Sequence, residues 1–580
     1  MIKTLAKSIR EYKKASILTP LFVSCEVIIE CLIPWIASIF IAEIESDTIR
    51  LKVVVGLGVL LVILAGVSLT FGALSAHNCA IASCGFAKNL RHDMYYAIQD
   101  YSFANIDKFS ASSLVTRMTT DVSNVQMSYM MLIRTAVRCP FMLLFALTMV
   151  IFISPRMALG FAVIVPILGI GLLLIMRNAH PIFKSVFKKY DNLNSSIQEN
   201  IHGMRVVKSF VREDYEKNKF GNASEEVAKD FKRAEKILAL NTPLMQLCFN
   251  LVMLFVCFFG SKLIVESNET LLNVGQMSAL LTYGAQILMS LMMVSMIIVM
   301  VSMSAASAAR IAEVLKEKTT IENPESPVTE VADGSIIFKG VNFSYSTSSE
   351  KKALSDINLY IDSGETVGII GGTGSGKTSL IQLISRLYDV TDGSVMVGGV
   401  DVREYDLEAL RNEVATVLQK NVLFSGTIKE NLRWGDPNAS DEEIERICKL
   451  AAADEFIKTF PDGYDTYIEQ GGTNVSGGQK QRLCIARALI KKPKILILDD
   501  STSAVDTKTD ALIRRSFAEE IPGTTKIIIA QRISSVENAD KIVVLDGGRI
   551  ESIGKHEELL EISPIYREVY NSQVKGDSEE

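Results

Sequence analysis

Six long apolar runs in the first half of the chain constrain its fold more than any other feature. Each is long enough to cross the hydrocarbon core of a bilayer, about 30 Å thick, as a helix. They lie at Ile17–Ala42, Val53–Leu74, Ala136–Ile153, Met157–Met176, Pro243–Val265 and Val274–Met303. The composition agrees, because 48% hydrophobic residues and a mean hydropathy of +0.25 are too apolar for a soluble protein of 580 residues. The sequence predicts an all-α polytopic domain with six transmembrane helices in a lipid bilayer.

The segments between these runs predict the orientation of the domain. Ser154-Pro155-Arg156 alone separates the third and fourth runs, which indicates a tight turn. Long segments rich in Lys and Arg, helical in pattern, follow the second and fourth runs. Because basic loops stay on the cytoplasmic side, we expect the N-terminus and both long loops to be cytoplasmic. Residues 1–14 are expected to form a basic amphipathic segment on the membrane surface, and no cleavable signal peptide is predicted.

The second half of the chain has a different character. Apolarity stops after Arg310, and a segment with prolines and glutamates is typical of a linker. From Ser335 onward short apolar strands alternate with helices, as in a soluble α/β domain. We therefore predict a membrane domain at 1–316, a linker at 317–334 and a nucleotide-binding domain at 335–580.

A phosphate-binding motif opens a helix in this second half. It reads Gly371-Gly372-Thr373-Gly374-Ser375-Gly376-Lys377-Thr378, continues into Ser379, and follows the apolar strand pattern of residues 366–370. Glycines let consecutive backbone N–H groups converge on phosphate oxygens at the positive end of the helix. The lysine adds a charge for the β- and γ-phosphates, and the Thr378 hydroxyl is a ligand for Mg²⁺. The motif predicts binding of ATP or GTP.

Two further motifs narrow the class of nucleotide-binding protein. The apolar run at 495–498 ends in Asp499, a carboxylate that suits the Mg²⁺-organising position called Walker B. Between the two sites lies Val475-Ser476-Gly477-Gly478-Gln479-Lys480-Gln481-Arg482. This run resembles the signature of the ABC transporter family. The resemblance covers essentially the whole chain, since six spans followed by one P-loop ATPase domain are similar to a half-transporter of the exporter type.

The resemblance implies roles for further residues. Tyr345 would stack on adenine, Gln419 would contact Mg²⁺ and the attacking water, and Asp506 would signal across a dimer. The implied Mg²⁺ ligands are then Thr378, Gln419 and Asp499. A core tyrosine and a helix N-cap remain local alternatives for Tyr345 and Asp506. In the resembled family ATP lies between the phosphate loop of one subunit and the signature of another, here Ser476, Gly477, Gly478 and Gln479.

Three departures from the family pattern bear on catalysis. Asp500 stands where a catalytic Glu is usual, and its carboxylate would sit about 1.5 Å back, a misplacement that can lower a rate about 10²-fold. Gln531 replaces the switch His and cannot become cationic. The run at 468–472 also departs from the usual sequence before the signature. With the signature intact, these changes predict a slow own site and a heterodimer whose partner subunit supplies the working residues.

The apolar half holds two candidate substrate features. Glu26 and Glu30 share one helix face, and Arg134 and Arg138 share another at a comparable depth. They are expected either to pair with each other or to bind a polar or cationic substrate. Methionines recur at helical spacing in the last span, where they either pack between helices or line an adaptable cavity. These are Met289, Met293, Met296, Met300 and Met303.

Other classes of site find no support in the sequence. A net charge of −6 gives no basic footprint for nucleic acid. The nine cysteines form no C-x-x-C pair and the five histidines lack ligand spacing, so no metal cluster is predicted. We predict an ATPase that exports a small hydrophobic or amphipathic drug, lipid or peptide across a bacterial inner membrane. A regulatory subunit without turnover and an importer on the same scaffold are the alternatives.

Overall fold

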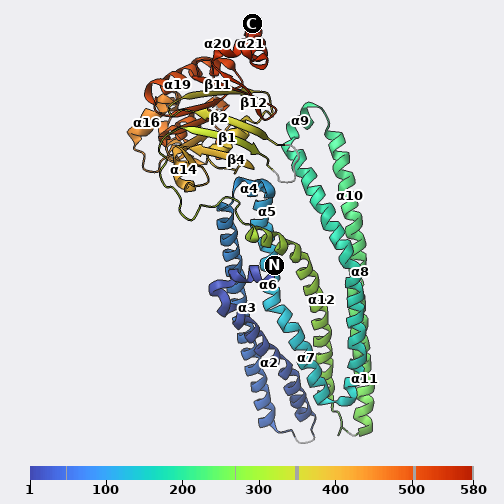
Figure 1. Ribbon diagram of the computed structural model, residues 1–580. Coiled ribbons are helices and arrows are strands. Elements are labelled where there is room, and N and C mark those ends of the chain that lie inside the picture. The colour runs from blue at the N-terminus through green and yellow to red at the C-terminus, as the bar shows by residue number, and fades with distance from the viewer. Residues whose placement is uncertain (47–48, 268, 346–351, 501–504, 578–580) are drawn as a thin grey trace. The chain divides into compact units, whose positions relative to one another are not determined.

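The computed structural model describes residues 1–46, 49–267, 269–345, 352–500 and 505–577, and it divides into two compact units. One unit consists of Met1–Asp100 and Phe109–Glu317. The other consists of Tyr101–Lys108 and Lys318–Glu580. Figure 1 shows helices throughout the first unit and strands with flanking helices in the second.

The described part of the first unit is helical throughout. Its elements are α1 (Ile2–Ala6), η1 (Lys7–Tyr12), α2 (Lys13–Glu45), α3 (Leu51–Gln99), α5 (Ala111–Thr116), the π-helical turn η2 (Arg117–Asp121), α6 (Val122–Ile133), α7 (Thr135–Ile153), α8 (Pro155–His202), α9 (Met204–Ser209), α10 (Glu213–Leu238), α11 (Asn241–Ser267) and α12 (Val274–Lys316). Six helical segments of the described residues are long and apolar enough to cross a membrane. They contain the six predicted runs, so the prediction of six spans is confirmed.

The predicted turn between the third and fourth spans is a single extended residue. Ser154 has φ −154° and ψ 103° between α7 and α8, and Pro155 occupies the first turn of α8. Proline suits that position because the first N–H groups of a helix have no partner within it. The long loops are confirmed as helical, since α3 and α8 run on beyond the predicted apolar runs.

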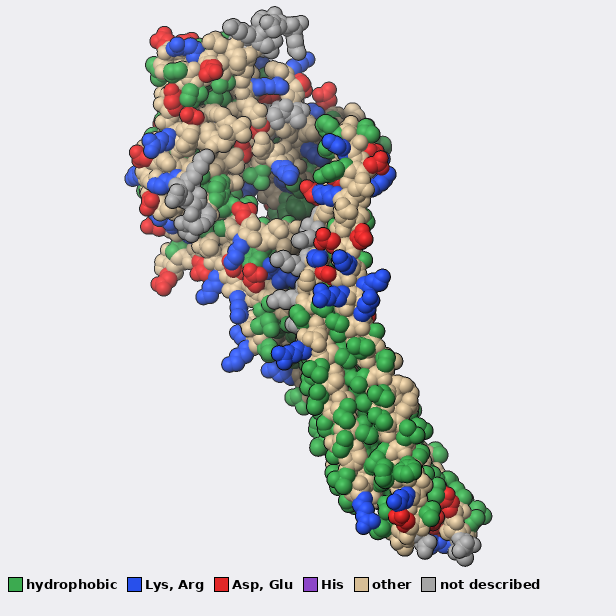
Figure 2. All heavy atoms as spheres, turned by 90° about the vertical axis from the view of Figure 1, so that its right-hand side faces the viewer, with side chains coloured by type: hydrophobic (Ala, Val, Ile, Leu, Met, Phe, Trp, Pro, Cys, Tyr) green, Lys and Arg blue, Asp and Glu red, His purple; other side chains and the backbone are tan. Residues whose placement is uncertain are grey.

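Apolar side chains cover the outer faces of α8 and α11. Figure 2 shows this band, with charged side chains at both of its ends. Lys262 pairs with Glu266 near one end, and Lys189 pairs with Asp230 at 2.9 Å near the other. The band includes the exposed residues Leu159, Val163, Ile167, Ile170, Leu247, Leu254 and Phe258. An exposed belt of this kind fits helices solvated by lipid.

A buried polar seam joins η2 and α6 to the end of α12. Asp121 is 1% exposed and accepts hydrogen bonds from Arg310 Nε at 2.7 Å and Ser307 Oγ at 2.7 Å. One turn away, Arg117 pairs with Glu313 at 2.8 Å. Since each buried charge has an opposite partner, the seam fixes these helices in one register.

The second unit is an α/β fold, as predicted. Its strands are β1 (Ile336–Phe343), β2 (Leu354–Ile361), β3 (Thr366–Gly371), β4 (Asp392–Val397), β5 (Val400–Asp401), β6 (Val414–Val417), β7 (Gly426–Thr427), β8 (Tyr467–Ile468), β9 (Ile495–Asp499), β10 (Thr525–Ile529), β11 (Lys541–Asp546) and β12 (Arg549–Gly554). Its helices are α13 (Lys377–Ile384), α14 (Leu407–Glu413), α15 (Ile428–Leu432), α16 (Asp441–Leu450), α17 (Asp454–Ile457), α18 (Gly477–Ile490), α19 (Thr507–Glu520), α20 (His556–Ile562) and α21 (Pro564–Asp577), with the short turns η3 (Gly463–Asp465), η4 (Gln470–Gly472) and η5 (Ile533–Ser535).

The sheet order brings distant motifs to one edge. The larger sheet has the order β12-β11-β3-β10-β9-β6, and its strands are parallel from β11 to β6. A four-stranded antiparallel sheet, β2-β1-β4-β5, forms a second layer. Because the carboxyl ends of parallel strands meet at the same edge, the residues after β3, β10, β9 and β6 lie next to one another.

Two short segments join the second unit in ways that composition did not predict. The helix α4 (Phe103–Phe109) begins within it, and Tyr388 donates a 2.6 Å hydrogen bond to Asp107. Burial and the neighbouring Asp107 raise the pKa of Tyr388. Residues 318–334, most of the predicted linker, also lie against this unit through a bridge of Val328 with Tyr405. Buried Ile321 and Val331 anchor that segment despite its linker-like composition.

Candidate functional site

The phosphate loop runs from β3 into α13 and requires glycine at specific positions. Gly374 and Gly376 have φ values of +80° and +98°, a left-handed conformation that other residues rarely adopt. A Cβ at Gly376 would lie 2.8 Å from Leu354 and 2.9 Å from the carbonyl of Ala353. The backbone is therefore free to present N–H groups at the start of α13, which is a ready site for phosphate.

Lys377 lies folded within this loop. Its Nζ donates 2.8 Å hydrogen bonds to the carbonyls of Gly371 and Gly372. Burial lowers the pKa of Lys377, and the carboxylates of Asp499 and Asp500 act against this shift. The ammonium is thus held beside the phosphate loop by weak neutral acceptors.

Thr378 and Asp499 form an oxygen-rich pair next to the lysine. The Thr378 hydroxyl donates to Asp499 Oδ2 at 3.1 Å, and Asp499 is 3% exposed. Burial, reinforced by the charge of Asp500, raises the pKa of Asp499, while Thr378 and Lys377 oppose the rise. A hydroxyl beside a carboxylate is the kind of ligand set that Mg²⁺ prefers, so the residues present fit that ion.

Asp500, Gln419 and Gln531 converge on one another. Asp500 Oδ2 accepts hydrogen bonds from Gln531 Nε2 at 2.7 Å and from Gln419 Nε2 at 3.3 Å. Each residue follows a neighbouring strand, β9, β10 or β6, so the parallel order places them together. Asp500 has φ +48°, a strained left-handed conformation, and its N–H is held by the carbonyl of Ile529 at 3.0 Å.

Tyr345 lies beside the helix that follows the phosphate loop. Its hydroxyl is 2.9 Å from Ser379 Oγ and donates to Gln382 Oε1 at 3.0 Å. The residue is 52% exposed, and its ring meets Tyr388 edge-on at 5.2 Å. Such exposure does not fit the alternative of a buried core tyrosine, and it leaves an aromatic surface available to a planar ligand.

Both halves of the chain match known protein families. Residues 17–306 match the ABC transporter transmembrane region, and residues 354–503 match the ABC transporter family proper. The chain is 34% identical to an uncharacterized ABC transporter ATP-binding protein, YfiB, of Bacillus subtilis, over 90% of each chain.

The chain belongs to the ABC transporter family.

Two other similarities bear on its type. The chain is 31% identical to an ATP-dependent lipid A-core flippase of Desulfotalea psychrophila, over 84% of each chain. Its fold is similar to that of a bacterial Atm1-family ABC exporter with ATP bound, with a TM-score of 0.82, 23% identity, and coverage of 97% of this chain and 99% of that one. The chain is therefore an integral multi-pass membrane protein with the fold of a bacterial ABC exporter, and its ABC ATPase domain binds ATP and is coupled to transport.

The ABC signature forms the start of α18. Ser476 is the N-cap, and its Oγ accepts from the Gln479 N–H at 3.3 Å while Gln479 Oε1 accepts from the Ser476 N–H at 2.9 Å. This capping box leaves Ser476 and Gly477 exposed at the positive end of a 14-residue helix. The arrangement can receive an anion from outside the chain.

Asp506 is the N-cap of α19, the role that its local sequence offered as an alternative to a contact across a dimer. Its carboxylate accepts from the Thr509 N–H at 3.0 Å, and this backbone hydrogen bond lowers the pKa of Asp506. Ser503 and Ala504 of the same motif lie outside the described residues. The N-cap accounts for the local geometry and leaves the exposed outer face of Asp506 open to a second subunit.

The run at 468–472, just before the signature, forms a turn that is held by its neighbours in the chain and by the carbonyl of Leu423. Glu469 accepts from Thr473 Oγ1 at 2.7 Å and donates its N–H to Asn474 Oδ1 at 3.0 Å. The Gly471 N–H also bonds the carbonyl of Leu423 at 3.1 Å. The polar groups of this turn are thus largely directed at the loop itself.

The charged residues in the membrane helices form a three-residue cluster. Arg138 of α7 donates to Glu26 Oε1 and Glu30 Oε2 of α2, both at 2.7 Å. Among the described residues, both ion pairs to these glutamates come from Arg138 and none comes from Arg134, so the expected pairing is found for one of the two arginines. The reason is local, because Arg134 lies at the break between α6 and α7 with φ −112° and ψ −66°.

The methionines of α12 lie away from its packed face. Buried Tyr283, Ile287 and Ser290 mark the side of α12 that packs within this chain, and Tyr283 donates to the carbonyl of Cys31 at 2.5 Å. The exposed fractions of the methionines are 58% for Met289, 46% for Met293, 56% for Met296 and 45% for Met303, and Met300 is partly buried. Helix packing inside this chain therefore does not account for the stripe.

Two side chains near the site were not predicted from the sequence. Gln382 holds the Tyr345 hydroxyl, and Gln573 bonds the backbone of the loop that carries Gln531. A polar residue within the otherwise apolar second half of α13 is a weak signal for Gln382. Gln573 lies 42 residues from its partner Gln531, and no local pattern reveals that contact.

Proposed function

We propose that this chain is one subunit of a heterodimeric ABC exporter whose own ATP site hydrolyses slowly. One observation carries the proposal: the Asp500 carboxylate accepts hydrogen bonds from the amides of both Gln531 and Gln419. A general base must reach the proton that it abstracts. Asp500 is shorter than the glutamate usual in the family and already bonded on the same oxygen by two donors, which disfavours that role.

The ATP site is proposed on the residues around the phosphate loop. The β- and γ-phosphates would meet the N–H groups of residues 371–379 and the Lys377 ammonium, and adenine would stack on Tyr345. Thr378, Asp499 and Gln419 would hold Mg²⁺, which neutralises phosphate charge when bound. The hydrogen bond between Thr378 and Asp499 at 3.1 Å supports this ligand set.

A second subunit is proposed to complete the site. The exposed N-terminus of α18, with Ser476 and Gly477, offers N–H groups and a helix dipole to a phosphate carried by another chain. Asp506 would contact the same partner. A half-transporter with an intact signature and a weak own site is best explained by a partner that carries the stronger catalytic residues.

The proposed substrate is a small hydrophobic or amphipathic molecule, such as a drug, lipid or peptide. The exposed methionines of α12 support this class, because flexible thioethers adapt to varied apolar ligands. The similarity to a protein named as a lipid A-core flippase favours a lipid. Glu26 and Glu30 are proposed to be structural, since Arg138 pairs with both. A cationic substrate remains the alternative for them.

Two other functions use the same scaffold. A regulatory subunit would bind ATP and never turn it over, and an importer would move substrate inward. Vesicle assays that report the direction of substrate movement distinguish import from export. We favour export across a bacterial inner membrane with the ATPase domain in the cytoplasm, on the strength of the exporter-type fold and the basic loops.

The test uses the complex of this chain with a candidate second half-transporter. Asp500→Asn in this chain should leave ATP turnover of the complex within about twofold, because the partner's catalytic carboxylate performs most hydrolysis. The matching substitution in the partner should lower turnover about 10²-fold or more. Loss of turnover on Asp500→Asn to the same extent would contradict the proposal.

A further inference from the structure

The loop after β10 carries Gln531 and is held by side chains from two helices. Gln573 of α21 bonds it on one side, with Oε1 accepting from the Ile533 N–H at 2.9 Å and Nε2 donating to the Gln531 carbonyl at 2.8 Å. An amide offers one acceptor and two donors, so its orientation here matches one backbone N–H and one C=O. The clip therefore fixes the backbone on both sides of Arg532.

The helix α21 is well anchored for this purpose. Tyr566, in its first turn, is fully buried, and its hydroxyl lies 2.7 Å from His556 Nδ1. Val569 and Tyr570 pack on the same core. Gln573 lies seven residues after Tyr566, so the two share one face of the helix. A rigid helix thus delivers the Gln573 amide to the loop.

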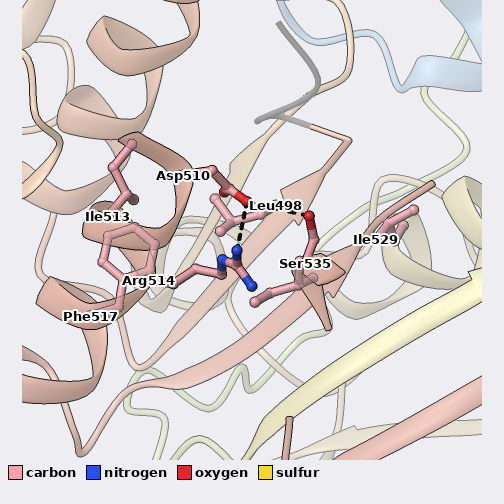
Figure 3. Close-up of a pocket in the computed structure, with 8 residues that line it drawn as sticks. Leu498, Asp510, Ile513, Arg514, Phe517, Ile529 and Ser535 are labelled. Carbon is pink, nitrogen blue, oxygen red and sulfur yellow. Dashed lines mark hydrogen bonds and ion pairs between the residues drawn. The ribbon is translucent and has the colours of Figure 1, made fainter. Parts of the chain in front are cut away.

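The second contact comes from α19. Arg514 Nη1 donates to the Ser534 carbonyl at 2.6 Å, and Arg514 pairs with Asp510 at 2.9 Å. Asp510 Oδ2 also accepts from Ser535 Oγ at 3.3 Å. Figure 3 shows Asp510, Arg514 and Ser535 directed toward one another beside Leu498 and Phe517. Asp510 is 6% exposed and the Arg514 side chain 21%, so the carboxylate is buried and the guanidinium is only partly exposed.

The ion pair of Asp510 and Arg514 is not the most stabilising choice for this position in the fold. Asp510 Oδ1 and Arg514 Nε are buried without a hydrogen-bond partner among the described residues. They line a cavity of about 10 Å³, roughly the space of one water molecule. Apolar residues of similar volume often stabilise a fold at least as well as such a pair. What the pair adds is directed hydrogen bonding to the loop that carries Gln531.

We propose that Gln573 and Arg514 are positioning residues that clamp this loop and aim Gln531 at the γ-phosphate of ATP. The inference rests on the proposed ATP site, in which Gln531 meets the γ-phosphate. Gln531 is anchored at its own carbonyl by Gln573, and the turn immediately after it by Arg514 and Asp510. The same helix α19 is capped by Asp506, so a partner that moves the cap also moves the clamp.

The clamp is tested by how the full-length chain distinguishes ATP from ADP. Competition of Mg²⁺-ATP and Mg²⁺-ADP against a fluorescent nucleotide measures both dissociation constants. Gln531→Ala, Gln573→Ala and Arg514→Met should each weaken ATP binding about fivefold and change ADP binding less than about twofold. Adding Gln573→Ala to Gln531→Ala should weaken ATP no further, since one acts through the other.

Matched controls lie next to each clamp residue. In the described chain Ser572 donates to the carbonyl of Val569 in its own helix, and Arg515 pairs with Glu519. Ser572→Ala and Arg515→Met should therefore keep the wild-type ratio of the affinity for ATP to the affinity for ADP. Gln573→Glu keeps the acceptor for the Ile533 N–H and loses the donor to Gln531, so it tests the contact if Gln573→Ala does not fold.

Three results would overturn the inference. If Gln531→Ala lowers the ratio of ATP affinity to ADP affinity and both clamp variants leave this ratio at the wild-type value, the clamp does not position Gln531. If the clamp variants weaken ATP and ADP equally, their role is general folding. A ratio unchanged by Gln531→Ala would overturn the proposed role of Gln531 itself, and the clamp inference with it.

Discussion

The side-chain amide of Gln531 donates a 2.7 Å hydrogen bond to the carboxylate of Asp500. These residues are two of the three departures from the family pattern, and they replace the usual catalytic Glu and switch His. The two side chains are therefore hydrogen-bonded to each other, and the Gln419 amide donates a second hydrogen bond to the same oxygen of Asp500. The contact connects the strand β9, the strand β10 and the loop after β6 at the edge where ATP is proposed to bind.

The Lys377 ammonium is expected to supply much of the affinity for ATP. Lys377→Ala should weaken Mg²⁺-ATP binding by the full-length chain at least about tenfold, because a hydrogen bond to a charged phosphate is lost. Equilibrium binding of a fluorescent nucleotide measures the change. Lys429→Ala is the control, since Lys429 pairs with Asp441 on α16. Unchanged affinity in Lys377→Ala would contradict the proposed phosphate site.

Asp499 should weaken the fold at neutral pH. Burial raises its pKa, so the folded state binds more protons than the unfolded state between the two pKa values, and stability falls as pH rises through that window. Asp499→Asn should therefore stabilise the nucleotide-free chain at pH 7.5 by about 1 kcal/mol. This gain should disappear as the pH falls below about 4, the usual pKa of Asp.

Thermal unfolding with and without Mg²⁺-ATP measures both the stability of the free chain and the stability that nucleotide binding adds. The wild type should gain more stability from Mg²⁺-ATP than Asp499→Asn does, because ligand binding stabilises in proportion to affinity. Asp506→Asn is the control, since a backbone hydrogen bond lowers the pKa of Asp506 and no gain is expected. An Asp499→Asn chain less stable than the wild type at pH 7.5 would show that its charge is not a cost to the fold.

Arg138 should be needed to keep two glutamates in the membrane helices. Arg138→Met leaves Glu26, which is 9% exposed, and Glu30 without their cation, and breaking a buried pair in this way costs about 3–5 kcal/mol. Thermal unfolding in detergent should show a large loss. Adding Glu26→Gln and Glu30→Gln should restore most of it, and Arg134→Met should have a smaller effect.

Transport by the same variants separates the two interpretations of the glutamates. If they are structural, the triple variant that regains stability should carry cationic and neutral substrates equally well. Selective loss of cationic substrates in that stable variant would instead assign Glu26 and Glu30 to substrate binding.

The methionine stripe of α12 should matter for substrate and little for folding. Met293→Ala and Met296→Ala together should change stability by less than about 1 kcal/mol, since both side chains lie about half exposed. They should alter how apolar substrates stimulate ATP turnover. Met142→Ala, at a site 5% exposed, is the contrast and should cost about 2–5 kcal/mol. Unaltered stimulation in the double variant would remove the stripe from the substrate path.

Local patterns predicted the elements well because each element is encoded by neighbouring residues. The six apolar runs and the glycines at 374 and 376 are properties of a few consecutive positions, and the structure places them as expected. The proximity of Asp500, Gln419 and Gln531 was available only through resemblance to a known family. Without it, the order of the parallel strands would have been undetermined.

Contacts that depend on tertiary packing could not be predicted from the sequence. Arg134 and Arg138 have the same spacing as the two glutamates, yet in the part of the chain that the structure describes only Arg138 pairs with them, because the helix breaks at Arg134. Gln573 and Asp107 contact residues far away in the chain, and nothing in their surroundings indicates those partners. The side of α12 that stays exposed likewise depends on which helices pack against it.

The most direct test of the slow own site is the ATP turnover of this chain purified alone, with Lys377→Ala as the blank. We predict turnover barely above the blank for the wild type. Asp500→Glu combined with Gln531→His should raise it by about 10²-fold, because a longer carboxylate and a titratable switch side chain restore the usual catalytic groups. Brisk turnover by the unmodified chain, with no gain from the double substitution, would contradict the account.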